Sequence, residues 1–478
     1  MRRLGLGVWF GGALLVLSGA ARPDDRTPRT PRTPAPPQVL LIAGVPHIRQ
    51  EPDFCGEACV AMALRKLGYD VGQRAVFDRT GVDPRLGRGA YTAELKRAID
   101  AFGFRPGPIW YRVSARNAAA ELERQLAAMT ADLARGVPSI VCMHYDRSPD
   151  APEHFRLVLG YDRATSEIIF HEPAQDQGAY KRMPRARFLE LWPLKYRRDD
   201  WTVIRFALEP GRMDVTPPPD GVTPAAHVQH VMKTKAKIPD GYATRIAGPF
   251  FVIGDEPPAR VEHHAQTVDW AVGHLKRDFH MREPADVIDV WLLGSHNSYV
   301  DNAVRLFGKA PSTPYGFFTP AHQSLFMNIA TGGGTLVHEV VHPFIAASFP
   351  SVPAWFNEGL ASLYEAVREE HGQLWGLPNW RLAGLKRAIR AGTLPSFATM
   401  TGDSDAAFYA SRTGYAQARY LCLYLQERGL LHRYYDAFSS GAAADPTGYR
   451  TLVRVLGHPE MTRFEQQWQA WALALEAD

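Results

Sequence analysis

The pattern of apolar and polar positions predicts both helices and strands in the first half of the chain. Apolar residues recur at helical spacing over residues 56–67 and again over residues 118–133. Three later stretches alternate or run apolar, as half-buried strands do, at 139–144, 154–161 and 167–171. Helices followed by a run of strands are typical of the α+β class.

The second half of the chain follows a different order. It begins with short apolar stretches typical of strands, at 249–253, 287–293 and 325–329. From residue 335 onward, helical periodicity dominates to the C-terminus. We therefore expect a small sheet followed by a mostly helical region, which again belongs to the α+β class.

Composition excludes several classes of protein. The 478 residues are 46% hydrophobic and 22% charged, which is typical of globular domains rather than of a polytopic membrane protein or a largely disordered chain. The formal net charge of +4 comes from 54 basic and 50 acidic residues, an excess too small to indicate a nucleic-acid partner. Because the chain has only four cysteines, it is not a disulfide scaffold.

The N-terminus has the pattern of an export signal. Arg2 and Arg3 precede an apolar run over residues 4–17, and small residues follow at 18–21. That run is shorter than the roughly 20 residues that a membrane-spanning helix needs. The sequence thus predicts a signal peptide over residues 1–20 and a secreted or periplasmic protein, with no stable membrane insertion after cleavage. An uncleaved N-terminal anchor is the alternative.

Two proline-rich stretches divide the rest of the chain. Prolines recur at close spacing over residues 21–38, so this stretch is predicted to be an extended linker. A second linker is expected over residues 209–224, around three consecutive prolines. These linkers delimit two predicted domains, 39–208 and 225–478, each large enough to bury a core of its own.

The motif from His338 to His342, His-Glu-Val-Val-His, is the most specific chemical signal in the chain. On a helix, residues four apart lie on one face a turn apart, so both imidazoles can reach one ion. Glu339 projects beside that ion, where its carboxylate can take a proton from bound water. A second apolar helix is predicted from residue 355, and its Glu358 is a natural third ligand. Two histidines and one carboxylate leave a fourth position open, as in a catalytic Zn²⁺ site.

This region resembles the gluzincin metallopeptidases, especially compact bacterial families in which HExxH is followed by a helix of the type N/S-E-G-L-A. The second motif here reads Asn-Glu-Gly-Leu-Ala over residues 357–361, and the resemblance covers roughly residues 245–440. It implies that His338, His342 and Glu358 are zinc ligands and that Glu339 is the general base and acid.

Three further expectations concern the surroundings of this site. The family usually has a downstream tyrosine that donates to the tetrahedral oxyanion; Tyr415 matches best and Tyr409 is the fallback, with a merely structural tyrosine as the alternative for both. Residues 315–319 and 325–329 resemble the edge strand that lies beside the substrate in that group. Because Pro343 has no N–H to bond the carbonyl four residues earlier, we expect the helix to bend there, beyond the ligands.

A second constellation lies in the first half of the chain. Cys55 stands at a predicted helix start, where the backbone dipole and free N–H groups favour the thiolate. His154 is the candidate imidazole partner. If the turn after its strand centres on residues 163 and 164, antiparallel partners sum to about 327, which places Glu172 nearly opposite His154. Glu172 could then orient the imidazole, and Gln50 could donate to an oxyanion.

The span of residues 45–192 resembles the papain-like C39 peptidases in their stand-alone, exported form. The matching motifs lie at 45–46, 50, 55–56, 136–141, 154–162 and 188–192. The resemblance implies Cys55 as nucleophile, His154 as base, Gln50 as oxyanion donor and Glu172 as orienting acid. The family normally has aspartate where Glu172 stands, and Gln50 precedes Cys55 by five residues where six is commoner.

Three other interpretations of Cys55 stay open. It could pair with Cys59, although two cysteines four apart on a helix have poor disulfide geometry. It could be a small buried hydrophobe, which is the usual role of a free cysteine. The domain could also bind peptide without cutting it.

Together these signals predict a papain-like C39-type domain followed by a mostly helical gluzincin-type domain with a small N-terminal sheet. The predicted function is an exported peptidase that hydrolyses peptide bonds by zinc-activated water, with a second, cysteine-dependent site. The alternative is a zinc peptidase whose C39-like domain is a non-catalytic binding module for peptide or cell-wall material. In both cases the expected partner is a peptide or protein substrate, not a nucleic acid.

Overall fold

The computed structural model describes residues 38–218, 220–458 and 460–476. The chain divides into two units, residues 1–38 and residues 39–478, and the second unit contains the elements below. The predicted signal peptide, and the first linker apart from Gln38, lie outside the described residues. Among the described residues, no helix combines the length and the apolar character needed to cross a membrane.

Within the described part of the N-terminal half, a seven-stranded antiparallel sheet runs in the order β3-β8-β4-β5-β6-β7, with β1 paired to β5. The strands are β1 (Val39–Leu41), β3 (Trp110–Ser114), β4 (Ser139–His144), β5 (Glu153–Asp162), β6 (Glu167–His171), β7 (Lys181–Pro184) and β8 (Asp200–Ala207). Strands β4 and β6 have the predicted bounds, and β5 exceeds its prediction by one residue at each end.

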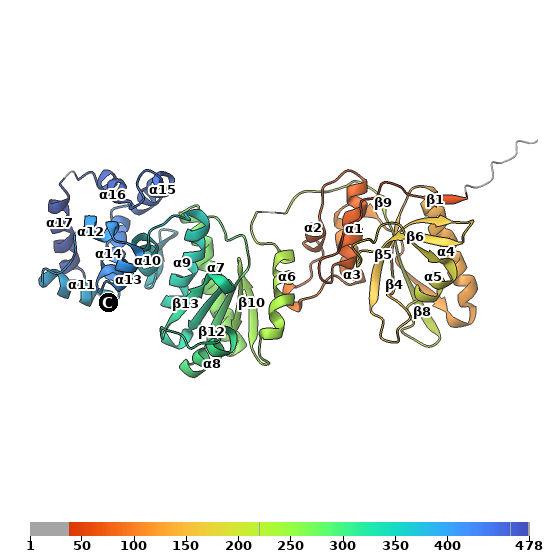
Figure 1. Ribbon diagram of the computed structural model, residues 1–478, viewed down its shortest axis with the longest axis horizontal. Helices are drawn as coiled ribbons and strands as arrows, with labels where there is room; N and C mark the ends of the chain where they lie inside the picture. Colours follow the sequence, from red (N-terminus) through yellow and green to blue (C-terminus); the bar gives the residue numbers. More distant parts are fainter. Residues whose placement is uncertain (1–37, 219, 459, 477–478) are drawn as a thin grey trace, which may run out of the picture. The chain divides into compact units, whose positions relative to one another are not determined.

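Helices cover both faces of this sheet (Figure 1). They are α1 (Cys55–Lys66), α2 (Gln73–Phe77), α3 (Thr92–Ala101), α4 (Ala118–Ala134) and α5 (Arg185–Leu191). Along β4, Ile140 and Cys142 join the core that contains α1 and α3, whereas Val141 and Met143 join the core that contains α4 and α5. Because successive side chains of a strand point to opposite faces, this one strand is buried on both sides.

The β5–β6 hairpin brings His154 and Glu172 together as predicted, but its register differs. A bulge between Val158 and Gly160 inserts an extra residue into β5. Leu157 therefore pairs with His171. At this end of the hairpin, away from the turn, the residue numbers of paired residues thus sum to one more than predicted. Hydrophobic alternation gives the face of each residue but contains no signal for an inserted one.

The described residues of the C-terminal half contain a five-stranded sheet in the order β10-β11-β12-β14-β13. Its elements are β10 (Ala243–Ala247), β11 (Phe250–Gly254), α7 (Pro258–Asp278), β12 (Ile288–Leu293), α8 (His296–Phe307), β13 (Gly316–Thr319) and β14 (Ser324–Asn328). Strands β11, β12 and β14 are parallel, and α7 and α8 form the crossovers on opposite faces. Strand β13 lies at the edge of the sheet, as expected.

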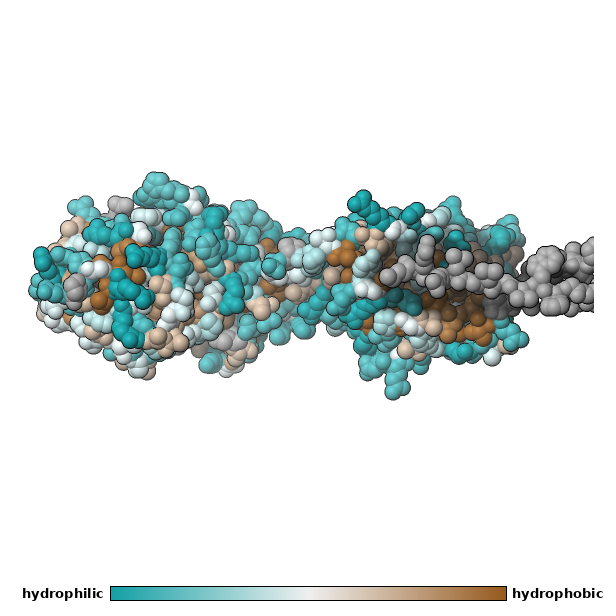
Figure 2. All heavy atoms as spheres, turned by 90° about the horizontal axis from the view of Figure 1, so that it is seen from above, coloured by the Kyte–Doolittle hydropathy of each residue, from teal (hydrophilic) through white to brown (hydrophobic). Residues whose placement is uncertain are grey.

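From α9 onward the described chain is mostly helical, as predicted. The helices are α9 (Gly334–Ser348), α10 (Ala354–Leu363), α11 (Arg381–Arg390), α12 (Phe397–Gly402), α13 (Asp405–Ala410), α14 (Gly414–Glu427), α15 (Leu431–Gly441), α16 (Tyr449–Leu456) and α17 (Met461–Ala474). A hairpin of β15 (Val367–Glu370) and β16 (Gln373–Gly376) interrupts them. Apolar residues of α9, α10 and α14 share one buried core, while polar residues cover most of the surface seen in Figure 2.

The stretch predicted as the second linker is tied to secondary structure at both ends. β9 (Glu209–Pro210) pairs with β2 (Phe104–Arg105), and α6 (Pro224–Thr234) begins at the last predicted linker residue. The hydroxyl of Thr223 caps α6 by accepting the N–H of Ala226. The domain boundaries themselves stay predictions.

Candidate active sites

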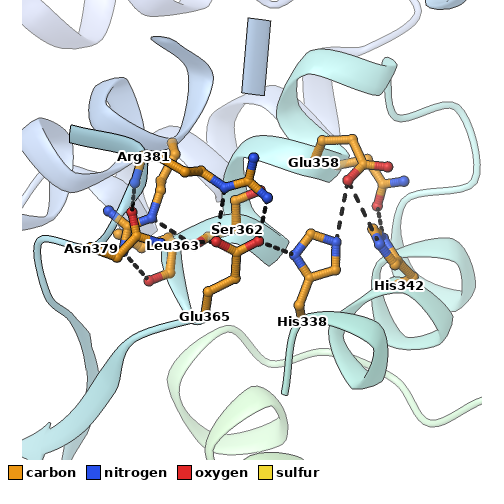
Figure 3. Close-up of polar contacts among 10 residues, drawn as sticks. His338, His342, Glu358, Ser362, Leu363, Glu365, Asn379 and Arg381 are labelled. Carbon is orange, nitrogen blue, oxygen red and sulfur yellow. Dashed lines mark hydrogen bonds and ion pairs between the residues drawn. The ribbon is translucent and has the colours of Figure 1, made fainter. Parts of the chain in front are cut away.

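Helix α9 places His338 and His342 one turn apart on one face, with ring centroids 4.9 Å apart (Figure 3). The helix is strongly apolar around them and buried on several sides, so its register is fixed by the core. It continues through Pro343 to Ser348, and the expected bend at that proline stays a prediction.

Helix α10 brings Glu358 against both histidines. Its Oε2 atom lies 3.3 Å from Nε2 of His338 and 3.9 Å from Nε2 of His342. One ligand atom from each of the three side chains falls within 4.8 Å of the others. The structure therefore brings together the three residues that the sequence predicts as metal ligands.

Residues that the sequence analysis missed contact the outer nitrogens of the two imidazoles, through a hydrogen bond at His342 and an ion pair at His338. Nδ1 of His342 donates to Oδ1 of Asn357 at 3.0 Å. Nδ1 of His338 lies 3.4 Å from Oε1 of Glu365, and Arg381 binds both oxygens of that carboxylate, at 2.9 and 2.6 Å (Figure 3). Such partners fix the tautomer and orientation of a metal-binding histidine. Asn357 stands directly before Glu358 in the motif, whereas Arg381 has no local signal.

The arrangement of His338, His342 and Glu358 is suited to a divalent cation. Oε2 of Glu358 is buried and, among the described residues, accepts no hydrogen bond, although it faces both Nε2 atoms. Burial lowers the pKa of His338, but the carboxylates of Glu358 and Glu365 outweigh it and raise that pKa to about 10. Burial raises the pKa of Glu358, and the two histidines outweigh it and lower that pKa. The three side chains therefore form a site that favours positive charge between two imidazoles and a carboxylate.

A cavity of about 660 Å³ opens beside one of the three predicted ligands, His338. His338, Glu339 and Tyr415 line it, together with Tyr315 and Gly316, where β13 begins. Glu339, the predicted general base, is buried at the wall of this cavity. The edge strand, the predicted base and the first-choice tyrosine share one cavity.

The two candidate tyrosines have different places. Tyr415 lines the cavity, and burial raises its pKa, so its hydroxyl keeps its proton. Tyr409 instead donates its hydroxyl to Oε1 of Glu358 at 3.2 Å. Of the two predicted candidates, Tyr415 therefore faces the cavity, whereas Tyr409 is engaged by Glu358.

In the N-terminal half, Cys55 begins α1 as predicted, yet its surroundings oppose the thiolate. Burial raises the pKa of the Cys55 thiol to about 12, and the carboxylates of Glu57 and Asp53 raise it further. The backbone N–H of Phe155 acts in the opposite direction with a smaller effect. The expected benefit of the helix start is thus outweighed by desolvation, which depends on tertiary packing.

His154 and Glu172 form the predicted pair. Nε2 of His154 lies 2.5 Å from Oε1 of Glu172, and both side chains are buried. Arg156, two residues along the same face of β5, donates its Nε to the other oxygen of Glu172 at 2.6 Å. Burial raises the pKa of Glu172, but His154 and Arg156 outweigh it and lower that pKa, so the carboxylate stays charged.

Among the described residues, no hydrogen bond joins Nδ1 of His154 to Sγ of Cys55. Gln50 is tied by its backbone, whose N–H donates to the carbonyl of Pro173 at 2.9 Å. Its side-chain oxygen is buried and has no hydrogen-bond partner among the described residues. All four cysteines are free, so the Cys55–Cys59 disulfide is absent from the described structure.

Residues 42–198 match the Peptidase_C39 like family. The match covers five of the seven strands of the sheet, β3 to β7, and all four residues predicted for the thiol site. It supports a C39-like fold and a peptidase-related function for this part of the chain. A peptidase family implies a peptide or protein substrate. No curated protein matches the chain.

Proposed function

We propose that the C-terminal half is a zinc-dependent peptidase of the gluzincin type. The observation that carries the proposal is the buried Oε2 of Glu358, which has no hydrogen-bond partner in the described structure and lies against Nε2 of both His338 and His342. These three atoms would hold the ion, and the adjoining cavity leaves a fourth position open to water. Supporting contacts from Asn357 and Glu365 match the outer contacts of metal-binding histidines.

The chemistry divides among residues of the cavity. Zinc, held there by His338, His342 and Glu358, would supply Lewis acidity toward water and the scissile carbonyl. Glu339 accepts the proton of the attacking water and delivers it to the leaving amine. Tyr415 donates its hydroxyl to the carbonyl oxygen as negative charge develops there. The free edge of β13 offers backbone groups to an extended peptide, which would lie across the cavity as an added strand.

A pair of histidine variants tests the metal assignment. The purified chain is expected to hold about one zinc ion, and His338→Ala is expected to lose it because two remaining ligands do not form a tetrahedral site. His371→Ala is the control, since that imidazole is 86% exposed and lies on the β15–β16 hairpin. Stoichiometric zinc in His338→Ala, measured by elemental analysis after dialysis, would contradict the assignment.

A second candidate function is cysteine-dependent peptide hydrolysis at Cys55, favoured by the contact of His154 with Glu172. In this proposal, Nδ1 of His154 takes the thiol proton as the thiolate attacks, and Glu172 stabilises the resulting imidazolium. Gln50 donates to the oxyanion. Because the pKa of Cys55 is raised in the free protein, the thiolate forms only as the proton moves to His154.

Inhibitor sensitivity separates this function from a non-catalytic role. If Cys55 is a nucleophile, Cys55→Ala and a thiol alkylator each remove the part of peptide hydrolysis that a chelator leaves. If the C39-like domain only binds peptide or cell-wall material, neither changes hydrolysis, and Cys55→Ala retains binding. Cys422→Ala is the matched control, because Cys422 is a free, buried cysteine of the other half.

Export is part of the same proposal. It rests on the predicted signal peptide at residues 1–20, which precedes the described chain. Expression with this segment should yield a secreted or periplasmic protein whose N-terminus, read by Edman degradation, lies near residue 21. A cell-associated product that retains residue 1 would favour the anchor alternative.

A further inference from the structure

The segment of residues 45–50 carries the proposed oxyanion donor but belongs to no strand or helix. Its backbone polar groups need partners, and it finds them in the chain that follows β6. The N–H of Val45 donates to the hydroxyl of Tyr180 at 2.9 Å, and the N–H of Gln50 donates to the carbonyl of Pro173 at 2.9 Å. The segment that carries Gln50 is thus bound to the segment that carries Glu172.

His171 lies at the centre of these contacts and is 0% exposed. Its Nδ1 accepts the N–H of Tyr180 at 2.9 Å, and its Nε2 donates to the carbonyl of Val45 at 3.0 Å. A backbone N–H can only donate and a carbonyl can only accept, so the two bonds define the neutral tautomer with its proton on Nε2. A proton added to Nδ1 would face the N–H of Tyr180 and break that bond.

The loop after β6 is folded tightly around this imidazole. Tyr180 adopts a positive φ of 48°, which is rare for an aromatic residue, and its ring lies edge-on to His171 with centroids 4.5 Å apart. Gly178 approaches so closely that a Cβ atom there would lie 1.9 Å from the carbonyl oxygen of Glu172. Such a conformation persists only where its surroundings hold it.

The ionisable groups around His171 disfavour a charge on it. Burial lowers the pKa of His171 and outweighs the hydrogen bond to the carbonyl of Val45, which raises it. A charge on His47, whose ring lies 5.5 Å away edge-on, lowers the pKa further. Tyr180 is the other ionisable ring in contact with His171. The carboxylate of Glu172, the next residue in the chain, binds His154 and Arg156. The neutral form is therefore the native one, and the closed arrangement loses stability relative to the open one as the pH falls from the ordinary value of 6.5 toward the lowered pKa of His171.

We propose that His171 is a positioning residue for the thiol site. In its neutral form it closes a latch of Val45, His171 and Tyr180 that holds Gln50 beside Glu172, and its protonation opens that latch. The inference rests on the second proposed function, because it assigns His171 to the geometry of the cysteine site. It makes that site sensitive to acid through a residue that touches neither thiol nor substrate.

Hydrogen exchange of the full chain, read by mass spectrometry, tests the latch without any activity. The exchange rates are first corrected for the intrinsic pH dependence of amide exchange. The equilibrium constant for opening of residues 45–50, taken relative to that of β4, should then rise roughly tenfold as the pH falls from 7.5 to 5. This is the effect of losing about one hydrogen bond. His171→Gln cannot titrate and should show no such acid step. His144→Gln, which removes an imidazole from the end of β4, should keep it.

A second variant covers the case in which His171→Gln does not fold. Tyr180→Phe removes the acceptor for the N–H of Val45 and should raise exchange of residues 45–50 at both pH values, with the acid step retained. A flat pH profile in the wild-type chain, or an acid step that survives in His171→Gln, overturns the latch.

Cleavage assays separate this inference from the function on which it rests. Cys55-dependent hydrolysis without an acid step in exchange contradicts the latch alone. An acid step in exchange, with hydrolysis unchanged in Cys55→Ala, supports the latch and contradicts the cysteine-peptidase function.

Discussion

Removing the charge of Glu365 should weaken metal binding without removing any ligand. The carboxylate of Glu365 lies 3.4 Å from Nδ1 of His338 and is held by Arg381. In Glu365→Gln the side chain keeps its shape, but His338 loses the negative partner that orients it and raises its basicity. Loss of such an outer contact typically lowers metal affinity 10- to 100-fold, or by about 1.4–2.7 kcal/mol.

The assay is a competition titration of the metal-free chain against a chromogenic chelator of known affinity. Glu370→Gln is the matched control, because Glu370 also pairs with an arginine, Arg368, but on the β15–β16 hairpin rather than at His338. Equal thermal melting of the metal-free variants confirms that the fold is retained. Wild-type affinity in Glu365→Gln would refute the assignment of Glu365, whereas a similar loss in both variants would show a non-specific effect of charge.

Three further predictions concern the base, the thiol and a buried acid. Glu339→Gln should bind zinc normally yet lose about 10²–10⁴-fold in chelator-sensitive turnover, measured with a quenched peptide, and unchanged turnover would place the base elsewhere. Although burial raises the pKa of Cys55, transfer of its proton to His154 should let it alkylate faster than Cys142 and Cys422, and His154→Ala should slow that labelling, followed by mass spectrometry; equal labelling of all accessible thiols would mean that no catalytic pair exists. Burial raises the pKa of Glu57 to about 8, so the native state keeps a proton that the unfolded chain releases above pH 4.5. The free energy of unfolding therefore falls as the pH rises from 4.5 to 8. Urea unfolding at several pH values should show this slope in the wild type and a flatter one in Glu57→Gln, and equal slopes would contradict it.

The features that the sequence predicted well depend on local spacing. His338 and His342 share a helical face because they are one turn apart, and no tertiary information is needed to see it. The strands β4 and β6 were bounded correctly because apolar runs between polar residues are a local signal. Glu358 was found through its motif, and its position beside the histidines depends only on two consecutive helices packing together.

The features that sequence reasoning missed depend on residues far apart in the chain or on burial. Arg381 reaches Glu365 from a later helix, and no spacing rule links the two. The raised pKa of Cys55 comes mainly from desolvation, which the helix-start argument left out. Arg156 could have been found, because strand alternation places it on the same face of β5 as His154.

The central claim, that zinc held by His338, His342 and Glu358 supports peptide hydrolysis, is tested most directly by metal removal and reconstitution. The purified chain would be stripped with a chelator, dialysed, and assayed on a peptide substrate before and after addition of one equivalent of zinc, with Cys55→Ala as background to exclude thiol activity. We predict loss of hydrolysis on stripping and recovery at about one zinc per chain, with no recovery in Glu358→Gln. Full hydrolysis by the stripped chain, or recovery in Glu358→Gln equal to that of the background protein, would contradict the account.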